Sequence, residues 1–252
     1  TAVGFQAMNA NTIGDNNTAS GYRSLYQNQD GDDNTAYGYS ALRSNTASGN
    51  TAMGSFTMST NNTGEYNTAM GYNSLIMNNS GSENTAIGNY SMALNTSGSS
   101  NTALGSQSLF TNSTGYSNVA VGASSLRKNS TGHNNVAVGD SALFNNTASN
   151  NTAIGSKTLF TNTSGYSNVA IGRNSLYNNT TGDYSIAIGD SALFTQDERG
   201  LNIAIGFKTL FSLNPNVFSG THNIAIGYKT LMSTSLASSN VAVGSFSLYD
   251  NT

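Results

Sequence analysis

The segment 151–172 has the sequence NTAIGSKTLFTNTSGYSNVAIG and contains one short phrase twice. The phrase is Asn, Thr or Val, Ala, Ile and Gly, and its two copies end at Gly155 and Gly172. Over the whole chain Ala-x-Gly forms a periodic series of fifteen copies, from Gly4 to Gly244, and of the fourteen intervals between its Gly residues eleven are 17 residues, two are 16 and one is 21. A fixed period of this kind is typical of repeat proteins, in which each unit packs on the next.

The composition is unusual for a globular protein and yet indicates an ordered chain. Only 8% of the 252 residues are charged, against about 25% in an average domain. Disordered chains combine high net charge with few aromatic residues. Here the net charge is -3, and the chain contains 13 Tyr and 10 Phe. We therefore expect an ordered all-β repeat structure.

Several classes of function are disfavoured by composition. The chain has no Cys, which excludes disulfides and Cys-based zinc sites. Nine basic residues and a pI near 5.1 argue against a nucleic-acid partner. No apolar run reaches the roughly 20 residues of a membrane span, and no signal peptide is visible. Because the series of repeats is uninterrupted from Thr1, we expect residues 1–252 to be a single repeat domain, a fragment of a longer fibre.

The repeat predicts one coil of a β-solenoid. Thr, Val or Ile on both sides of Ala favours a short strand, and the Gly after it favours a tight corner. We expect a second short strand around the Ser-Leu-Phe segment, followed by a polar Asn-Thr-Ser-Gly turn. The fold class is therefore all-β: a parallel β-solenoid, or β-roll, of about fifteen 17-residue coils, stacked about 4.8 Å apart.

Each repeat carries an Ala, the Gly two residues later and a Leu or Met four residues after the Gly, and thirteen of the fourteen residues that directly precede a repeat are Asn, with Ser185 as the exception. In the middle of the chain these are Ala103, Gly105, Leu109, Asn118, Ala120, Gly122, Leu126 and Asn135. A second Asn column lies seven residues after the repeat Gly in most repeats, as at Asn11, Asn112 and Asn162. Stacked Asn side chains either form amide ladders from coil to coil or serve only as turn residues, and both interpretations stay open.

The strand is apolar on both of its faces. Ala points one way while its neighbours, such as Val119 and Val121, point the other. One coil has only one interior, so the second face requires cover, and a copy of the same chain around a closed axis is the economical choice. The residue after the Leu is often aromatic, as in Tyr26, Phe110, Phe160 and Tyr177. This stripe is either a subunit interface, which we favour, or a binding stripe.

The segments 118–126 and 135–143, with the pattern Asn-Val-Ala-Val-Gly-x-Ser-x-Leu, resemble the head repeats of trimeric autotransporter adhesins and related bacterial or phage fibre proteins. The resemblance spans all the repeats. It implies a left-handed parallel β-roll, assembly as a homotrimer, and a stiff adhesive head at the outer cell surface. The unit here is longer than the usual repeat of that family, and the additional residues fall in the Asn-Thr-Ser-Gly corner.

These observations lead to a functional expectation with two alternatives. We expect a structural and adhesive extracellular fibre segment, a rigid trimeric rod with loops that attach to a host or abiotic surface or to a glycan, and no enzymatic activity. The first alternative is a shaft or receptor-binding segment of a phage tail fibre, located on a virion. The second is an ice-binding solenoid, suggested by a column of Thr: Thr1, Thr18, Thr35, Thr51, Thr68, Thr85 and Thr102.

Aromatic residues directly after the repeat Gly are candidate ligand contacts. Tyr22, Tyr39 and Tyr72 occupy this position and would suit stacking on sugars. Phe218 lies in the 21-residue unit, where an insertion would form a loop on one side of the solenoid. The other interpretation is that these are scattered surface aromatics and, at Phe218, a tolerated bulge.

Candidate metal and catalytic groups are sparse. Asp30, Asp32 and Asp33 surround Gly31 and form the densest acidic spot, a candidate calcium site, although a solvated turn explains them as well. The two His residues, His133 and His222, lie about five coils apart in one chain and are not expected to share a metal. We expect no catalytic residue and no other cofactor.

Overall fold

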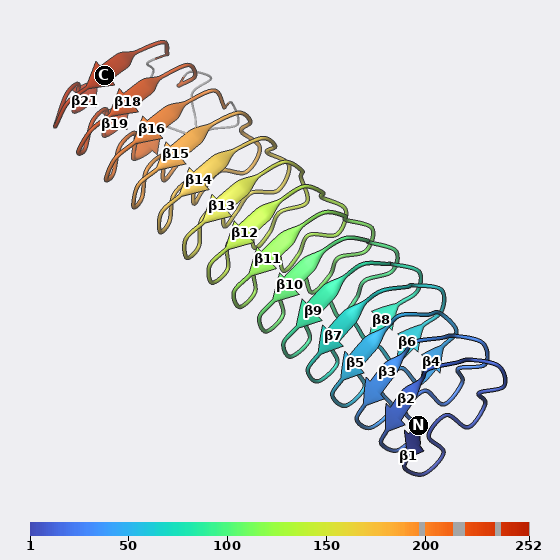
Figure 1. Ribbon diagram of the computed structural model, residues 1–252. Helices are drawn as coiled ribbons and strands as arrows, with labels where there is room; N and C mark the ends of the chain where they lie inside the picture. Colours follow the sequence, from blue (N-terminus) through green and yellow to red (C-terminus); the bar gives the residue numbers. More distant parts are fainter. Residues whose placement is uncertain (197–199, 214–219, 235–237, 252) are drawn as a thin grey trace. The chain divides into compact units, whose positions relative to one another are not determined.

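The computed structural model describes residues 1–196, 200–213, 220–234 and 238–251. The chain forms two compact units, residues Thr1–Thr131 and Gly132–Thr252. Within the described residues each unit consists of short strands joined by turns, without a helix. In each unit, consecutive repeats stack as consecutive coils (Figure 1). The all-β parallel solenoid predicted from the repeat is therefore confirmed.

The main sheet of the first unit takes one strand from each repeat. Within residues 1–131 the strands are β1 (Ala2–Val3), β2 (Thr18–Ser20), β3 (Thr35–Tyr37), β5 (Thr51–Met53), β7 (Thr68–Met70), β9 (Thr85–Ile87), β10 (Thr102–Leu104) and β11 (Val119–Val121). These eight strands pair in parallel and in sequence order, which gives seven turns. The register keeps equivalent residues together, as in the pairing of Ala103 with Ala86 and Ala120.

The second unit repeats this arrangement. Its described main-sheet strands are β12 (Val136–Val138), β13 (Thr152–Ile154), β14 (Val169–Ile171), β15 (Ile186–Ile188), β16 (Ile203–Ile205), β18 (Ile224–Ile226) and β20 (Val241–Val243). These seven parallel strands give six turns. The 21-residue repeat keeps the register, because Ala204 of β16 still pairs with Ala225 of β18.

The interior of each coil is narrow and is filled by small and aliphatic side chains. Ala103 and Ala120 point inward from their strands and are fully buried. Leu109 and Leu126, on the opposite side of their coils, are also fully buried. The Ala face of the strand is therefore internal, on the side of the Leu column, and the face that carries Thr, Val and Ile is external.

The second strand predicted at Ser-Leu-Phe is wrong in its position. This segment is a turn, in which the conserved Leu takes a left-handed conformation, for example Leu109 at φ 47° and Leu126 at φ 48°. Two-residue strands do occur further along some coils, in two small parallel sheets: β4 (Ser44–Asn45), β6 (Thr60–Asn61) and β8 (Met77–Asn78); and β17 (Ser212–Leu213), β19 (Ser233–Thr234) and β21 (Asp250–Asn251). Complete burial of the Leu side chain offsets a backbone conformation that costs about 1–2 kcal/mol.

The Asn ladders are confirmed. In the column after the Leu, Asn112 Nδ2 donates to Asn95 Oδ1 of the preceding coil at 2.8 Å and to Gly115 O of its own turn at 2.9 Å or less. In the column before the strand, Asn118 Nδ2 donates to Asn101 Oδ1 at 3.1 Å. All four Asn side chains are buried. A buried amide is tolerated only when its polar atoms are satisfied, and the neighbouring coils satisfy these.

The repeat Gly is required by the backbone. Gly105 has φ +139°, and a Cβ placed there would lie 2.6 Å from the carbonyl oxygen of Gly122 in the next coil. Gly122 likewise has a positive φ, at 125°. Close stacking of coils at this corner therefore leaves no room for a side chain.

Candidate interaction surfaces

The outer face of the main sheet in the second unit is almost entirely aliphatic. Its outward residues are Val136, Val138, Thr152, Ile154, Val169, Ile171, Ile186, Ile188, Ile203, Ile205, Ile224, Ile226, Val241 and Val243. None of them is buried, and Ile154 is 39% exposed. Thirteen of these fourteen residues are Val or Ile, so the face is a continuous apolar surface. We refer to it as the aliphatic face.

The outer face in the first unit is of mixed character. One column is the predicted Thr ladder, in which Thr35 pairs in register with Thr18 and Thr51. The other column contains larger apolar side chains, and Tyr37, Met53, Met70, Ile87, Leu104 and Val121 follow one another from strand to strand. The first unit therefore combines a hydroxyl column with an apolar column on one sheet.

Aromatic rings line the corner after the repeat Gly in the first unit. The three sequence-predicted contacts Tyr22, Tyr39 and Tyr72 all lie in this row. The centroid distances along it are 5.6 Å for Phe5–Tyr22, 4.9 Å for Tyr22–Tyr39, 5.1 Å for Tyr39–Phe56, 6.5 Å for Phe56–Tyr72, 5.6 Å for Tyr72–Tyr90 and 6.2 Å for Tyr90–Phe110. The row of rings is thus continuous from Phe5 to Phe110.

Two members of this row, Phe56 and Tyr90, were missed by sequence reasoning. Each lies one position later in its repeat than Tyr22 or Tyr72. Both have a left-handed backbone, with φ 56° and φ 55°, and their rings reach the same row. A search that allowed either of the two positions after the Gly to carry the aromatic residue would have found them.

The second unit has its own aromatic stacks. The predicted column after the conserved Leu forms one of them, with centroid distances of 5.1 Å for Phe144–Phe160, 5.3 Å for Phe160–Tyr177, 5.2 Å for Tyr177–Phe194 and 5.1 Å for Phe194–Phe211. Their interplanar angles are all 20° or less. Rings stacked this closely cover one another's faces, so the column contributes first to cohesion between coils.

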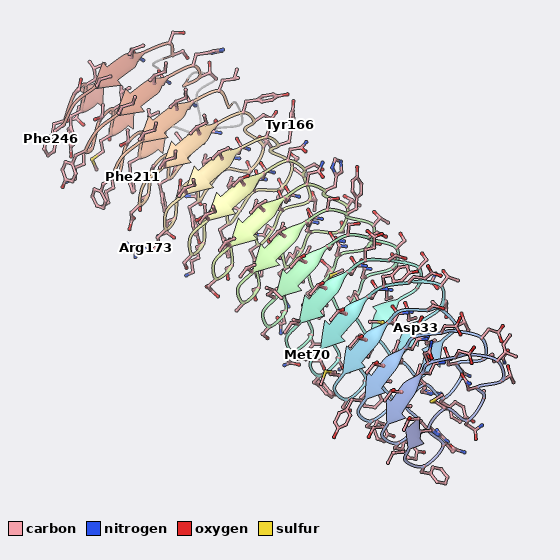
Figure 2. The ribbon with its side chains drawn as sticks, viewed as in Figure 1. Asp33, Met70, Tyr166, Arg173, Phe211 and Phe246 are labelled. Carbon is pink, nitrogen blue, oxygen red and sulfur yellow. The ribbon has the colours of Figure 1, made fainter. Side chains whose placement is uncertain are left out.

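Basic side chains lie over these rings. Arg23 is placed over Tyr22 at 5.1 Å, and Lys208 over Phe207 at 5.5 Å. Figure 2 shows Arg173, Phe211 and Phe246 along one edge of the second unit, while Tyr166 projects from the opposite edge. We call the first edge, which follows the repeat Gly, the glycine corner, and the other, which precedes the strand, the loop corner.

The loop corner contains further ionisable groups. In the second unit, a hydrogen bond with Tyr184 and the nearby Asp183 carboxylate raise the pKa of Tyr166 to about 12. The ring centroids of Tyr166 and Tyr184 lie 5.1 Å apart in an edge-to-face contact. This trio is solvent-facing, and it carries no nucleophile and base pair of the kind that acyl transfer requires.

The candidate calcium residues lie at the loop corner of the first unit. Asp32 Oδ1 accepts a hydrogen bond from the backbone N–H of Asp15 at 2.7 Å, so this carboxylate joins two coils. Among the described residues no group of three or more His, Asp or Glu side chains gathers as a metal site would require. Calcium at Asp30, Asp32 and Asp33 stays a prediction.

The remaining predicted positions have simple outcomes. Phe218 lies outside the described residues. His133 and His222 both lie at the loop corner, and His222 Nδ1 contacts the hydroxyl of Thr221 at 3.0 Å.

The described residues contain no helix that could span a membrane. Comparison of the chain with protein families, with curated proteins and with solved structures gave no match.

Proposed function

We propose that the chain is a structural segment of an extracellular fibre, in which three copies associate side by side along their stacks of coils. The observation that carries this proposal is the aliphatic face of the second unit, where thirteen of fourteen outward residues are Val or Ile. A solvent-exposed sheet face normally carries polar residues. An aliphatic one of this extent is typical of a surface that another molecule covers.

A second and a third copy of the same chain fit this face well. The outward residues repeat at every coil and in register, as Ile186 and Ile188 of β15 do with Ile203 and Ile205 of β16. A parallel copy at the same height would therefore meet equivalent residues level by level. Burying the exposed part of each Val or Ile is worth up to roughly 1 kcal/mol, and the gain adds up along the unit.

We propose further that the fibre contains three copies of the chain and that its coils are left-handed. Both follow the resemblance of segments such as 118–126 to the head repeats of trimeric autotransporter adhesins. A ring of three is a closed symmetry, so it covers each face without leaving an open one.

Adhesion is the role we propose for the assembled fibre. The Asn ladders and aromatic stacks join each coil to the next, which suits a stiff element. The loop corner of each unit presents polar groups, such as Asp33 in the first unit and Tyr166 in the second (Figure 2), and these would meet a host surface, an abiotic surface or a glycan. The same architecture would serve as the shaft or receptor-binding segment of a phage tail fibre. We propose no catalytic role.

Chain counting in solution tests the association. Sedimentation equilibrium of the purified chain should give three times the chain mass of 26.1 kDa. The double variant Ile186→Asp/Ile203→Asp places two charges on the aliphatic face and should give the single-chain mass. The control Thr163→Asp, at an exposed position of a polar turn, should remain trimeric. A wild-type chain that is monomeric at all accessible concentrations would overturn the proposal.

The Thr ladder supports a second candidate function in the first unit, ice binding. Thr18, Thr35 and Thr51 are exact register partners, and a regular row of hydroxyl and methyl groups can order water. The adjacent column contains Tyr37 and Met53 instead of Thr, so the row is one residue wide. Thermal hysteresis that is lost in Thr35→Lys would support this candidate, and absence of hysteresis in the wild-type chain would remove it.

A further inference from the structure

The charged residues of the first unit are divided between its two corners. The loop corner contains six carboxylates and no basic residue, at Asp15, Asp30, Asp32, Asp33, Glu65 and Glu83. The glycine corner and the turn after it contain the four basic residues and no acidic one, at Arg23, Arg43, Arg127 and Lys128. The two corners flank the outer face of the main sheet, one at the start of its strands and one at the end.

The opposite charges are too far apart to pair within one chain. The strand with its flanking Asn and Gly is five residues long and spans about 16 Å, which exceeds the Debye length of about 8 Å at physiological ionic strength. Within residues 1–131 neither Asp32 nor Asp33 forms an ion pair with Arg23 or Arg43. Asp33 and Arg43 are both exposed to solvent.

The same two coils carry both signs of charge. Asp15 precedes β2, and Asp32 and Asp33 precede β3, whereas Arg23 follows β2 and Arg43 follows β3. A second copy placed alongside at the same height would bring its glycine corner next to this loop corner. The acidic residues at the levels of β2 and β3 would then face the basic residues of the same levels.

We propose that copies of the chain meet through unlike edges: the loop corner of one copy, at Asp32 and Asp33, docks against the Arg23 and Arg43 edge of the next. This inference rests on the proposed association of copies and adds its direction. A contact between unlike surfaces closes into a ring when the rotation permits. A two-fold contact would instead place like-charged corners together, which opposes association.

Charge reversal tests the pairing, and the chain supplies its own control. Asp32→Lys/Asp33→Lys and Arg23→Glu/Arg43→Glu should each weaken association at least tenfold, and the variant that combines all four changes should recover it. Glu65→Lys/Glu83→Lys makes the same change in charge at the same corner, at the levels of β7 and β9, where the glycine corner carries Tyr72 and Tyr90 and no base. This control should change association less than threefold. Circular dichroism of each variant establishes that it is folded.

A neutral variant separates the charge from the local hydrogen bond. Asp32→Asn/Asp33→Asn keeps an acceptor for the Asp15 backbone N–H and should weaken association by an intermediate factor. In this variant the association constant should also depend less on NaCl concentration between 0.05 and 1 M than in the wild-type chain, because fewer exposed charges remain to be screened.

Cross-linking tests the direction of the contact, because the chain has no Cys of its own. A variant with both Asp33→Cys and Arg23→Cys, treated with a short bis-maleimide, should give a covalent three-chain species. Neither single variant should cross-link. Two-chain species from a single variant would indicate a two-fold contact and would overturn the inference.

The outcomes distinguish this inference from the proposed function. A wild-type chain that stays monomeric would overturn the proposed function and this inference with it. A wild-type trimer that is unaffected by reversal at Asp32 and Asp33 or at Arg23 and Arg43, or affected as much by the control, would overturn the charge pairing alone.

Discussion

Asn95 Nδ2 lies 2.6 Å from Oδ1 of Asn78, one coil earlier in the chain, and both amides are completely buried. The same Nδ2 also donates to Gly98 O, and Asn95 Oδ1 accepts from Asn112 of the following coil. One side chain therefore satisfies polar groups of three successive coils. The cohesion of the first unit depends on such links as much as on its narrow apolar interior.

Replacement of this amide should be costly. Asn95→Ala would leave Asn78 Oδ1 buried without this donor, at about 1–3 kcal/mol for a group that solvent cannot reach. It would also remove one of the two hydrogen bonds made by Gly98 O and one of the two made by Asn112 Nδ2. We expect a loss of roughly 2–4 kcal/mol in the free energy of unfolding, measured by urea denaturation. Asn89→Ala, at an exposed position, is the control and should change the free energy by less than about 0.5 kcal/mol. Equal effects of the two changes would contradict the ladder.

The repeat Gly should not tolerate replacement by a residue with a side chain. In Gly105→Ala the new Cβ would lie 2.6 Å from Gly122 O, on a backbone with φ +139°. Strain and overpacking together should destabilise the chain by about 3–5 kcal/mol, seen as a lower thermal midpoint. Ser106→Ala, one residue later and exposed, should have nearly the midpoint of the wild-type chain. A Gly105→Ala variant as stable as wild type would be inconsistent with the close stacking.

The aromatic stack of the second unit should contribute to stability through its ring contacts. Tyr177 stacks between Phe160 at 5.3 Å and Phe194 at 5.2 Å. Tyr177→Ala removes both contacts and should cost about 1–3 kcal/mol, whereas Tyr177→Phe keeps the ring and should cost much less. Hydrogen exchange should accelerate in the coils that contain these three residues. A uniform change along the unit would argue against a local role for the stack.

Asp190 should give the second unit a small dependence on acid pH. Ser191 Oγ donates to one carboxylate oxygen at 2.7 Å and Arg173 pairs with the other at 2.9 Å, which holds the pKa of Asp190 below its usual value. A lowered pKa stabilises the folded state fully above the unfolded value of about 3.9, and this contribution is lost as the pH falls through the folded pKa.

The effect should be below about 1 kcal/mol, because the Arg173 side chain is 66% exposed and solvent screens the pair. Asp190→Asn should reduce the difference in thermal midpoint between pH 6 and pH 2.5. The reduction should shrink in 0.5 M NaCl, as screening weakens the Arg173 contribution. A larger pH dependence in the Asn variant would reverse the assigned sign.

Much of the fold could be predicted from the spacing of a few residues. The Ala, Gly, Leu and Asn columns have one period, and a parallel stack is the arrangement that brings all of them into register. Whether Ala or its neighbours faced inward was open in the sequence. The volume of the interior determines which face is internal, because a narrow coil has room for Ala103 beside Leu109 but not for two rows of Ile.

Other features resisted prediction for physical reasons. A left-handed Leu such as Leu109 is uncommon, so strand propensity gave the wrong assignment for its segment. The row of aromatic rings was underestimated because Phe56 and Tyr90 use an adjacent backbone position to reach the same place in space. The surfaces that we propose for association could be identified only once the outward face of the strand was known.

The in-register hydrogen bonds of these coils run only to the layer before and the layer after, as Asn95 shows. Duplication or deletion of a whole repeat in the gene therefore changes the number of layers while every remaining side chain keeps its neighbours. Such a protein can vary its length in evolution by recombination between near-identical repeats, without compensating changes elsewhere in the chain.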